Sequence, residues 1–425
     1  MQLKNFTISG LFGRSGSSDI DFPIPSEDGD TPSVLMLHGR NGVGKTTILR
    51  MLNGLLSLDF NIFRQVPFDR CTLTFESGKR LDVEPVRDKQ LTSLAVSYGD
   101  LRVALHPEHS GPLLDDNRPQ VDEFRGEFLK DTDSINFEFI DTERLHQLLS
   151  AEEPLEPGAR VLQTQAVRMW LQTQRPNPKA RVRDQPPGLA LRVKAFIQEA
   201  QVNYRTFFSS REPDLFPRII ERLTSEEAPQ IYDINSLRRR VQDIHLKAKQ
   251  NDRLGLEADR WDFPQLMAQL DKLAPRSGEG LQQALTVLGS YVEQLESRAA
   301  ERGLVADRLL TFEALMKEFI EDKTVLIDPK LGFKITTASG QALEEHQLSS
   351  GEFHLLFLMV ASLVTRRRGT VIAIDEPEMS MHLAWQRALI PALVRCASNA
   401  QPLFIFATHS PDLAASYPEA LKRLM

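Results

Sequence analysis

Short apolar runs of strand length mark both ends of the chain, and helix-spaced apolar positions mark its middle. The strand-like runs of the first part are residues 2–8, 34–37, 71–75, 81–86, 101–105 and 135–140. Those of the last part are residues 324–327, 332–336, 371–374 and 403–407. Runs of this length, bounded by turn residues such as Ser77-Gly78, predict strands. The two ends of the chain therefore predict a core that contains β-sheet.

Apolar side chains in the middle recur every three or four residues, which places them on one face of a helix. They are Leu281, Leu285, Leu288, Val292 and Leu295, followed by Leu309, Phe312, Met316 and Phe319. Two heptads are too few for a long coiled-coil rod, and several prolines between Pro176 and Pro275 would interrupt one. We expect a compact helical insertion lobe at 141–322, between the two halves of the core at 1–140 and 323–425.

A glycine-rich segment follows the apolar run at 34–37, and a helix-like segment at 47–52 follows it in turn. It comprises Gly39, Arg40, Asn41, Gly42, Val43, Gly44, Lys45 and Thr46, with Thr47 next, and it matches the P-loop pattern G-x-x-x-x-G-K-[ST]. Its glycines allow successive N–H groups to face a phosphate at the positive end of the helix. Lys45 would contact the β- and γ-phosphates, and the Thr46 hydroxyl can hold Mg²⁺. An accidental match is the weaker interpretation, because both flanking elements are present.

Two later strand-like runs also end in residues with catalytic chemistry. The run at 371–374 ends in Asp375 and Glu376, and the run at 403–407 ends in Thr408-His409-Ser410. The carboxyl ends of parallel strands are where an open α/β sheet places its ligands. We expect Asp375 to orient Mg²⁺, Glu376 to act as general base, and His409 to join them. An acidic pair or a single histidine is commonly structural, but three converging strand ends favour a site.

The segment Leu348-Ser349-Ser350-Gly351-Glu352 precedes an apolar, helix-compatible stretch at 353–364. Serine and glycine at a helix start form a second anion site, away from the P-loop in sequence. We expect Ser349, Ser350, Gly351 and Glu352 to bind an anion there. In the alternative interpretation, Ser349 only caps the helix and Glu352 occupies its first turn, which explains the segment taken alone.

Together these motifs resemble those of ABC-type ATPases, and more narrowly the RecF/SMC/OLD branch. The further matching positions are Asp375-Glu376-Pro377-Glu378, His382, Trp385-Gln386 and Thr408-His409-Ser410-Pro411. The resemblance covers about residues 1–60 and 323–425. It implies an α/β fold, with a P-loop core of mixed sheet and flanking helices beside an antiparallel β-subdomain. It also implies Mg²⁺-dependent ATP hydrolysis in a homodimer or larger oligomer, because the ABC signature motif closes on nucleotide held by another copy.

One ABC feature is missing from its expected place. ABC proteins usually carry a glutamine after a core strand, where it senses Mg²⁺ and the attacking water. The strand at 135–140 runs instead into Asp141-Thr142-Glu143-Arg144. Either Gln147 or one of the polar residues 141–143 substitutes for that glutamine, or the sensor lies elsewhere.

The charge of the chain limits how it can meet nucleic acid. The net charge of −7 argues against a surface that binds nucleic acid throughout. Basic clusters occur between Arg175 and Arg183, between Arg238 and Arg253, and at 366–368. We expect the second, on a probable helix, to contact DNA or an acidic partner, with the members Arg238, Arg239, Arg240, Lys247, Lys249 and Arg253. A solvated helix face is the plainer interpretation.

The remaining features exclude several classes of protein. The apolar runs are too short for a membrane span, no leader is recognisable, and Cys71 and Cys396 form no metal or disulfide pattern, so we expect a cytoplasmic protein. Transporter ATPases have a signature closer to the P-loop and an aromatic residue near the adenine, whereas no tyrosine precedes Tyr98 here. Few residues follow His409, so we expect any nuclease to be a separate chain.

The resemblance leaves three functions open. Compact ATPases similar to this one occur in bacterial antiphage systems such as PARIS and Septu, beside a separately encoded nuclease. The leading hypothesis is therefore an ATPase whose nucleotide-driven association controls a nuclease or toxin effector, with DNA or a phage protein as trigger. A RecF-like ATPase that clamps DNA directly is the second hypothesis. A scaffold that nucleotide merely stabilises is the third.

Overall fold

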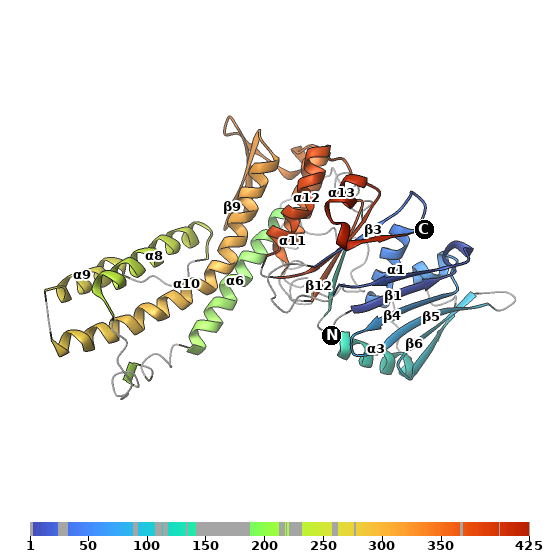
Figure 1. Cartoon of the computed structure of the whole chain (residues 1–425), viewed down its shortest axis with the longest axis horizontal. Helices are drawn as coiled ribbons and strands as arrows, with labels where there is room; N and C mark the ends of the chain where they lie inside the picture. Colours follow the sequence, from blue (N-terminus) through green and yellow to red (C-terminus); the bar gives the residue numbers. More distant parts are fainter. Residues whose placement is uncertain are drawn as a thin grey trace, which may run out of the picture. The chain divides into compact units, whose positions relative to one another are not determined.

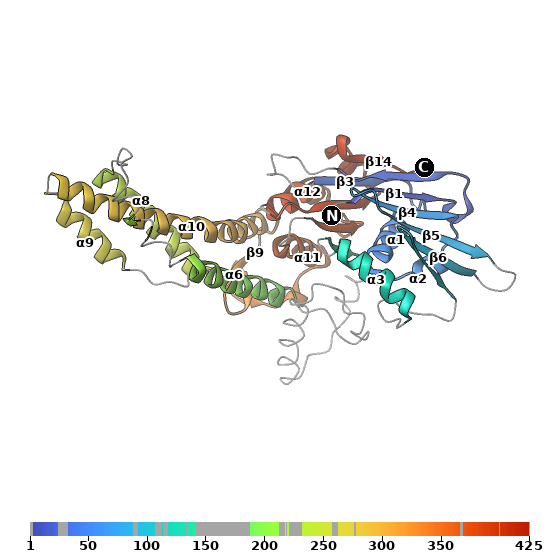
Figure 2. The ribbon, with the colours of Figure 1, turned by 90° about the horizontal axis from the view of Figure 1, so that it is seen from below.

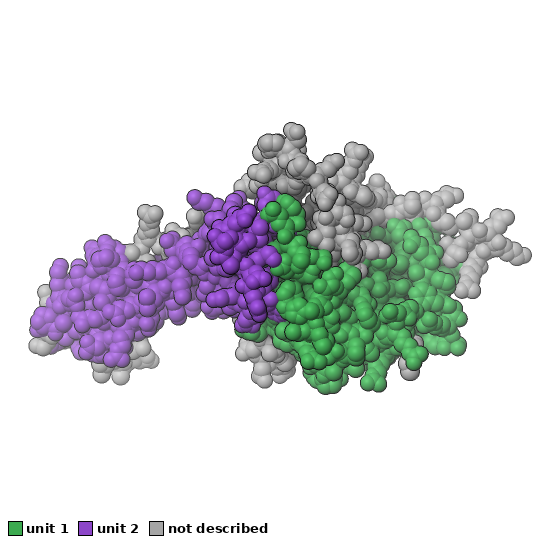
Figure 3. Space-filling view, turned by 90° about the horizontal axis from the view of Figure 1, so that it is seen from above, with its two compact units in different colours: residues 1–187, 346–425 green, residues 188–345 purple. Residues whose placement is uncertain are grey.

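The computed structural model describes residues 3–23, 33–87, 92–106, 113, 118–132, 135–141, 188–211, 217, 219–220, 232–256, 262–275, 278–365, 369–398 and 400–424. The chain forms two compact units, one of residues 1–187 with 346–425 and the other of residues 188–345 (Figures 1 and 3). The strands at 323–343 belong to the second unit, together with the helices that precede them. The predicted bounds of the lobe, 141–322, stay a prediction.

A parallel five-stranded sheet forms the centre of the first unit. Its strand order is β14 (Leu421–Arg423), β3 (Ser33–His38), β13 (Leu403–Thr408), β12 (Thr370–Asp375) and β8 (Asn136–Ile140). In the register, Thr408 pairs with His38 and Asp375 pairs with Ala407. Every residue of β12 is buried, as expected for a central parallel strand. The sheet therefore brings the carboxyl ends of β3, β12 and β13 to one edge, and it confirms the predicted α/β core.

An antiparallel six-stranded sheet forms the second layer of this unit. Its order is β2 (Ser17–Asp21), β1 (Leu3–Ser9), β4 (Arg70–Phe75), β5 (Arg80–Arg87), β6 (Thr92–Tyr98) and β7 (Leu101–Leu105). The helix α3 (Pro119–Thr132) packs Phe124 and Phe128 against Tyr98. The antiparallel β-subdomain is thus confirmed, and β6 and α3 are additions to the predicted elements. Parallel and antiparallel strands lie in separate sheets.

Besides α3, the first unit contains the helices α1 (Lys45–Ser57), α2 (Asn61–Gln65), α11 (Ser350–Val364), α12 (Leu383–Cys396) and α13 (Pro411–Ser416). Short 3₁₀ turns lie at Leu11–Gly13 and Pro418–Ala420, and another, Glu345–Gln347, lies where the two units join in the sequence. The helical segments predicted at 47–52 and 353–364 lie in α1 and α11. The helix α11 is buried on nearly all sides and packs beside α12 (Figure 2). Such all-round burial explains why its sequence is apolar without an amphipathic stripe.

The second unit consists mainly of helices. It contains α6 (Leu189–Arg211), α8 (Ile234–Arg253), α9 (Phe263–Leu273) and α10 (Glu279–Phe319), and a small sheet of β9 (Lys323–Asp328), β10 (Gly332–Thr337) and β11 (Ala342–Leu343). The two predicted apolar stripes lie on α10, a single helix of 41 residues. Its first stripe shares an apolar core with α8 and α9. Among the helices that the structure describes, none combines the length and apolarity needed to cross a membrane.

Candidate active site

The loop between β3 and α1 depends on its glycines. Gly42 and Gly44 have φ angles of 76° and 108°, in the region that glycine adopts without strain. A Cβ atom on Gly44 would lie 3.0 Å from side-chain atoms of both Leu11 and Phe12. A Cβ atom on Gly39 would lie 3.0 Å from the carbonyl oxygen at position 424. Any larger residue would therefore have to displace the loop from this shape.

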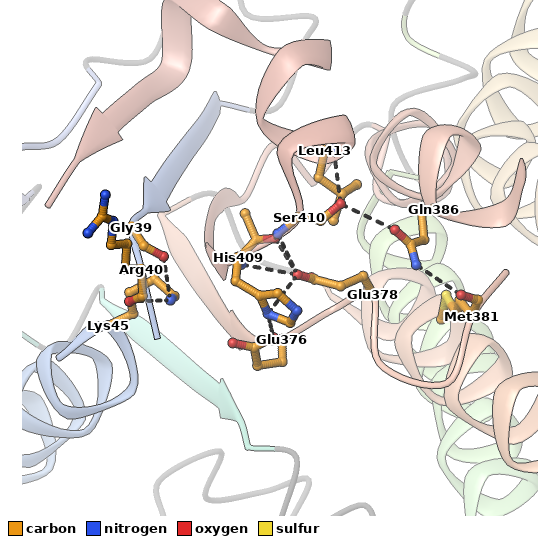
Figure 4. Close-up of polar contacts among 11 residues, drawn as sticks. Gly39, Arg40, Lys45, Glu376, Glu378, Met381, Gln386, His409, Ser410 and Leu413 are labelled. Carbon is orange, nitrogen blue, oxygen red and sulfur yellow. Dashed lines mark hydrogen bonds and ion pairs between the residues drawn. The ribbon is translucent and has the colours of Figure 1, made fainter. Parts of the chain in front are cut away.

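Lys45 is folded over the same loop. It is the first residue of α1 and only 5% exposed, and its Nζ donates to the carbonyl oxygens of Gly39 at 2.9 Å and Arg40 at 3.4 Å (Figure 4). Arg40 and Asn41 are exposed, and the predicted neighbours Val43, Thr46 and Thr47 are half-buried. The positive end of α1 and the Lys45 ammonium are thus held together, which is the arrangement that binds a phosphate anion.

Asp375 ends β12 in an almost fully buried position, where it is 3% exposed. Burial raises the pKa of Asp375 to about 6, although a hydrogen bond from the Thr46 side chain opposes this rise. Its Oδ1 atom has no hydrogen-bond partner among the described residues. A hydroxyl and a carboxylate are hard oxygen ligands, and a buried carboxylate oxygen without a partner fits a cation. Thr46 and Asp375 therefore fit the predicted Mg²⁺.

A third acid lies at the end of β8. Asp141 Oδ2 accepts from Arg50 Nη2 at 2.9 Å and from Arg50 Nε at 3.1 Å. The negative charge of Asp141 also contributes to the raised pKa of Asp375, and the charge of Arg50 opposes it. Asp141 is thus the described residue that stands where the ABC glutamine was expected. The other candidates, among them Gln147, lie outside the described residues.

The predicted catalytic pair meets across two neighbouring strands. Glu376 has a φ of 50°, a left-handed conformation that costs free energy in a residue other than glycine. Its N–H donates to the carbonyl oxygen of Ala407 at 2.8 Å, which joins the end of β12 to β13. Its Oε2 contacts Nδ1 of His409 (Figure 4). The Glu376 side chain is 24% exposed and that of His409 is 51% exposed, so solvent and substrate can reach both.

Glu378 lies on the loop that follows β12 and is 5% exposed. Its Oε1 accepts from the Thr408 hydroxyl and from the N–H groups of His409 and Ser410, each N–H at 3.1 Å. Glu376, Glu378 and His409 offer donor atoms within 4.8 Å of one another, the spacing of a metal site. Glu378 Oε1 and the Glu376–His409 pair are already hydrogen-bonded, whereas Glu378 Oε2 is buried and has no hydrogen-bond partner among the described residues. Glu378 was among the matching positions in the sequence, but no role was predicted for it.

The predicted signature forms the start of α11. The Ser349 hydroxyl accepts from the N–H of Glu352 at 3.4 Å, and Glu352 Oε2 accepts from the N–H of Ser349 at 2.8 Å, which is a capping box. Ser350 is exposed, and Gly351 is buried against Ser380, whose carbonyl oxygen would lie 2.5 Å from an added Cβ atom. The capping alternative thus accounts for Ser349 and Glu352 locally. Contact of the signature with nucleotide stays a prediction.

Two residues near the P-loop were missed from the sequence. Phe12 is 40% exposed, has a φ of 57°, and lies beside Gly44. The Arg14 guanidinium lies 5.8 Å from the Phe12 ring centre, and its Nη2 donates to the Gly42 carbonyl at 3.3 Å. In the sequence, the absence of a tyrosine before Tyr98 served only to argue against a transporter ATPase, and Phe12 was not considered. The glycine-rich segment at 10–16, with one phenylalanine and one arginine, is the sequence feature that could have pointed to these two residues.

The preferred basic cluster on α8 is largely engaged within its own unit. Arg238 pairs with Asp271, Arg240 with Glu296 through two bonds of 2.7 Å, and Arg253 with Glu313 at 2.8 Å and 2.9 Å. Arg239, Lys247 and Lys249 are exposed on the same helix, and the paired Arg253 is exposed at its end. Contact of this cluster with DNA or an acidic partner stays a prediction. The clusters at 175–183 and 366–368 lie outside the described residues.

Comparison with known proteins identifies a family over most of the chain. Residues 34–415 match the family described as "AAA domain, putative AbiEii toxin, Type IV TA system". This range includes the P-loop, Asp375, Glu376 and His409. No curated protein matches the chain.

Three solved structures of Smc head domains are similar to the chain at low identity. The head from Pyrococcus furiosus, with an extended coiled coil and bound to the C-terminal domain of ScpA, has 9% identity and a TM-score of 0.43, covering 98% of this chain and 91% of that one. A Smc head bound to the C-winged helix domain of ScpA has 10% identity and a TM-score of 0.39, covering 98% of this chain and 92% of that one. The Thermotoga maritima head domain has 10% identity and a TM-score of 0.36, covering 98% of this chain and 92% of that one. At such TM-scores we draw nothing further from the likeness.

Proposed function

The chain belongs to this AAA domain family, and on that premise we propose that it is a Mg²⁺-dependent ATPase whose nucleotide-driven association controls another protein. One observation carries the hydrolytic part. The neighbouring parallel strands β3, β13 and β12 end in the P-loop, in His409 and in Asp375-Glu376 respectively. A phosphate cradle, a buried acid and a carboxylate–imidazole pair thus lie along one sheet edge, which is the set that phosphoryl transfer to water requires.

Each group has a defined task in this proposal. Lys45 and the N-terminal amides of α1 bind the phosphates and offset their negative charge. Thr46 and Asp375 would hold Mg²⁺, which supplies charge neutralisation when bound. Glu376 accepts a proton from the attacking water, and the water oxygen forms a bond to the γ-phosphorus. The bond between the γ-phosphorus and the bridging oxygen breaks, and ADP leaves with that oxygen. His409 orients Glu376 and the water from the end of β13.

Phe12 and Arg14 extend the site on the other side of the P-loop. Their ring and guanidinium are exposed and lie beside Gly44 and Gly42. An exposed aromatic ring supports stacking of a base, and a guanidinium can contact a ribose or a phosphate. We assign these two residues to the nucleoside part of ATP.

The exposed position of Ser350 supports a site shared between copies of the chain. The capping box holds the backbone of α11 in place, and the Ser350 hydroxyl stays exposed at the positive end of the helix. A second copy that presents its P-loop-bound ATP to this end would complete both sites of a symmetric dimer. Binding of ATP would then drive association, and hydrolysis would release it.

The family description names a putative toxin of a type IV toxin–antitoxin system, which links the family to two-component systems without naming an effector that an ATPase controls. We propose that the ATP-bound assembly holds or releases a nuclease or toxin encoded beside it, and that DNA or a phage protein triggers the change. The exposed cations Arg239, Lys247 and Lys249 on α8 are the proposed contact for such an acidic trigger.

Two experiments test the proposal at its two levels. ATP binding and hydrolysis are measured for the wild-type chain, for Lys45→Ala and for the exposed control Lys4→Ala, with Mg²⁺ and with EDTA. We expect the wild-type chain to hydrolyse ATP only with Mg²⁺. Lys45→Ala should lose nucleotide binding, and the control Lys4→Ala should bind and hydrolyse ATP like the wild type. An intact Lys45→Ala activity would overturn the ATPase assignment. At the second level, phage plaque counts on cells that carry the native locus should rise when Glu376→Gln replaces the wild type. Unchanged counts would contradict the defence role and leave the ATPase intact.

A further inference from the structure

We propose that Glu378 is a positioning residue that holds His409 in contact with Glu376. The inference rests on the proposed ATPase function, because it concerns how the base and its imidazole partner are kept together. Glu378 does not itself contact Nδ1 of His409 closely, since the separation to Oε1 is 3.5 Å. Glu378 instead accepts hydrogen bonds from the backbone of the turn that carries the ring.

The turn between β13 and α13 depends on the Glu378 carboxylate. Consecutive N–H groups of His409 and Ser410 both donate to Oε1, and the Thr408 hydroxyl donates to the same atom. Burying a carboxylate is costly unless it is hydrogen-bonded, and bonds to an ionised acceptor are about twice as strong as neutral ones. A buried acid with three donors therefore specifies the path of residues 408–410.

The His409 ring has little else to hold it. Its side chain is 51% exposed, so packing contributes little to its orientation. The ring direction then follows from the backbone at 409 and from the contact with Glu376 Oε2. Because Glu376 and Glu378 lie two residues apart on one loop, that loop carries the base and also grips the backbone of its partner (Figure 4).

The loop itself is rigid enough to transmit this constraint. The N–H of Met379 donates to the Glu376 carbonyl at 3.1 Å, and the N–H of Met381 donates to the Glu378 carbonyl at 3.1 Å. Gln386 then joins both sides, since its Nε2 donates to the Met381 carbonyl at 2.9 Å and its Oε1 accepts from the Ser410 hydroxyl at 3.2 Å. Glu378 provides the charged bridge between loop and turn, and Gln386 provides a neutral one.

The substitutions follow from the donors around Oε1. In Glu378→Gln the amide oxygen can still accept from the turn, so the geometry is kept while the charge is lost. Glu378→Ala removes the acceptor from three donors. We expect kcat to fall about tenfold or more in Glu378→Ala and less in Glu378→Gln, with the Kd for ATP unchanged within about twofold, because the P-loop is untouched. Asp328→Asn is the matched control, since Asp328 accepts from two turn N–H groups in the other unit.

A double-substitution cycle separates positioning from general damage. If Glu378 acts through His409, Glu378→Ala should lower kcat in the wild type but not in a His409→Ala background. Equal loss in both backgrounds would overturn the inference, as would a kcat loss in Asp328→Asn that matches that of Glu378→Ala. A wild-type kcat in His409→Ala would overturn it too, together with the role of His409 in the proposed function.

A spectroscopic measurement tests the placement without hydrolysis. Ring ¹⁵N resonances of labelled histidine are recorded for the wild type, for Glu378→Ala and for Asp328→Asn, and His409 is assigned by the loss of its signals in His409→Asn. We expect the His409 signals to shift or broaden in Glu378→Ala, which removes the acceptor of the turn, and to stay in place in Asp328→Asn. Unchanged His409 signals would overturn the positioning role even if the chain is an active ATPase. Altered signals in a chain that does not hydrolyse ATP would support the positioning and contradict the proposed function.

Discussion

His409 and Glu376 meet through Nδ1 and Oε2, although 33 residues separate them in the sequence. The contact exists because β12 and β13 are parallel neighbours, with Asp375 opposite Ala407, so that the residues just beyond both strands emerge at one edge. A carboxylate that touches an imidazole is held in one orientation. The contact joins the end of the acidic strand to the end of the histidine strand, where we propose that Glu376 and His409 act together in hydrolysis.

Glu376→Gln should lower the ATP hydrolysis rate by about 10²- to 10⁴-fold, the usual contribution of a general base. ATP binding should remain, because the P-loop and the pair Thr46 and Asp375 are unchanged. The measurements are steady-state phosphate release and equilibrium binding of labelled ATP. The exposed helix residue Glu123 provides the control Glu123→Gln, which should keep the wild-type rate. Hydrolysis by Glu376→Gln at the wild-type rate would remove Glu376 from the mechanism.

Asp375→Asn should stabilise the protein without Mg²⁺, and more so at pH 7.5 than at pH 5. Burial raises the pKa of Asp375 to about 6 from 3.8, so the folded state binds this proton more tightly than the unfolded state. Ionisation of the buried carboxyl therefore lowers the free energy of unfolding as pH rises through this range. Well above pH 6 the full cost is present, on the order of 3 kcal/mol. Urea unfolding at both pH values measures the effect. An equal gain at the two pH values would show that charge burial is not the cause.

Gly351→Ala should destabilise the protein by on the order of 1–3 kcal/mol, because its Cβ atom would lie 2.5 Å from the Ser380 carbonyl oxygen. Gly303 is the matched control, since it also lies in a helix and a Cβ atom there meets nothing within 4 Å. Gly303→Ala should be neutral or stabilise by up to about 1 kcal/mol. Thermal unfolding compares the two. Equal effects would mean that the start of α11 tolerates movement away from Ser380.

Arg240→Glu should destabilise the second unit by on the order of 1 kcal/mol, whereas Arg239→Glu should not. Arg240 makes two bonds of 2.7 Å to Glu296, in a pair that is partly exposed, so solvent screening limits its value. Arg239 is exposed on the same helix. Only Arg239→Glu is therefore suited to test binding of an acidic partner. The difference in partner binding between the wild type and Arg239→Glu should become smaller as salt is added. Binding lost equally at low and high salt would indicate packing damage.

The parts of the fold that could be predicted are those with a local sequence pattern. The strand ends at His38, Asp375 and Thr408 were predicted because short apolar runs lead directly into polar residues there. The strand β6 and the helix α3 were not predicted, although both have a local period. Leu94, Val96 and Tyr98 alternate along β6, and Val121, Phe124 and Phe128 recur at helical spacing in α3. The strand β14 consists of Leu421–Arg423, which is too short and too polar to recognise before its partner β3 is known.

The site shows the same division between local and tertiary information. Lys45, Asp375 and Glu376 follow from motifs, because phosphate and metal chemistry imposes spacing along the chain. The role of Glu378 could not be predicted, since its bonds to the turn at 408–410 depend on how two strand ends lie side by side. Phe12 and Arg14 were missed for the same reason, because the β1–β2 connection approaches the P-loop only in the folded chain.

The central claim is that two copies of the chain build each ATP site, and mixing two inactive variants tests it most directly. Lys45→Ala disables the P-loop of its own chain, and Ser350→Arg disables the signature that its chain offers to the other copy. In a mixed dimer, one site combines the intact P-loop of the second variant with the intact signature of the first. We predict that each variant alone lacks ATP hydrolysis and that verified mixed dimers recover it in proportion to their number. Complete inactivity of verified mixed dimers would contradict the account, because each site would then be built within one chain.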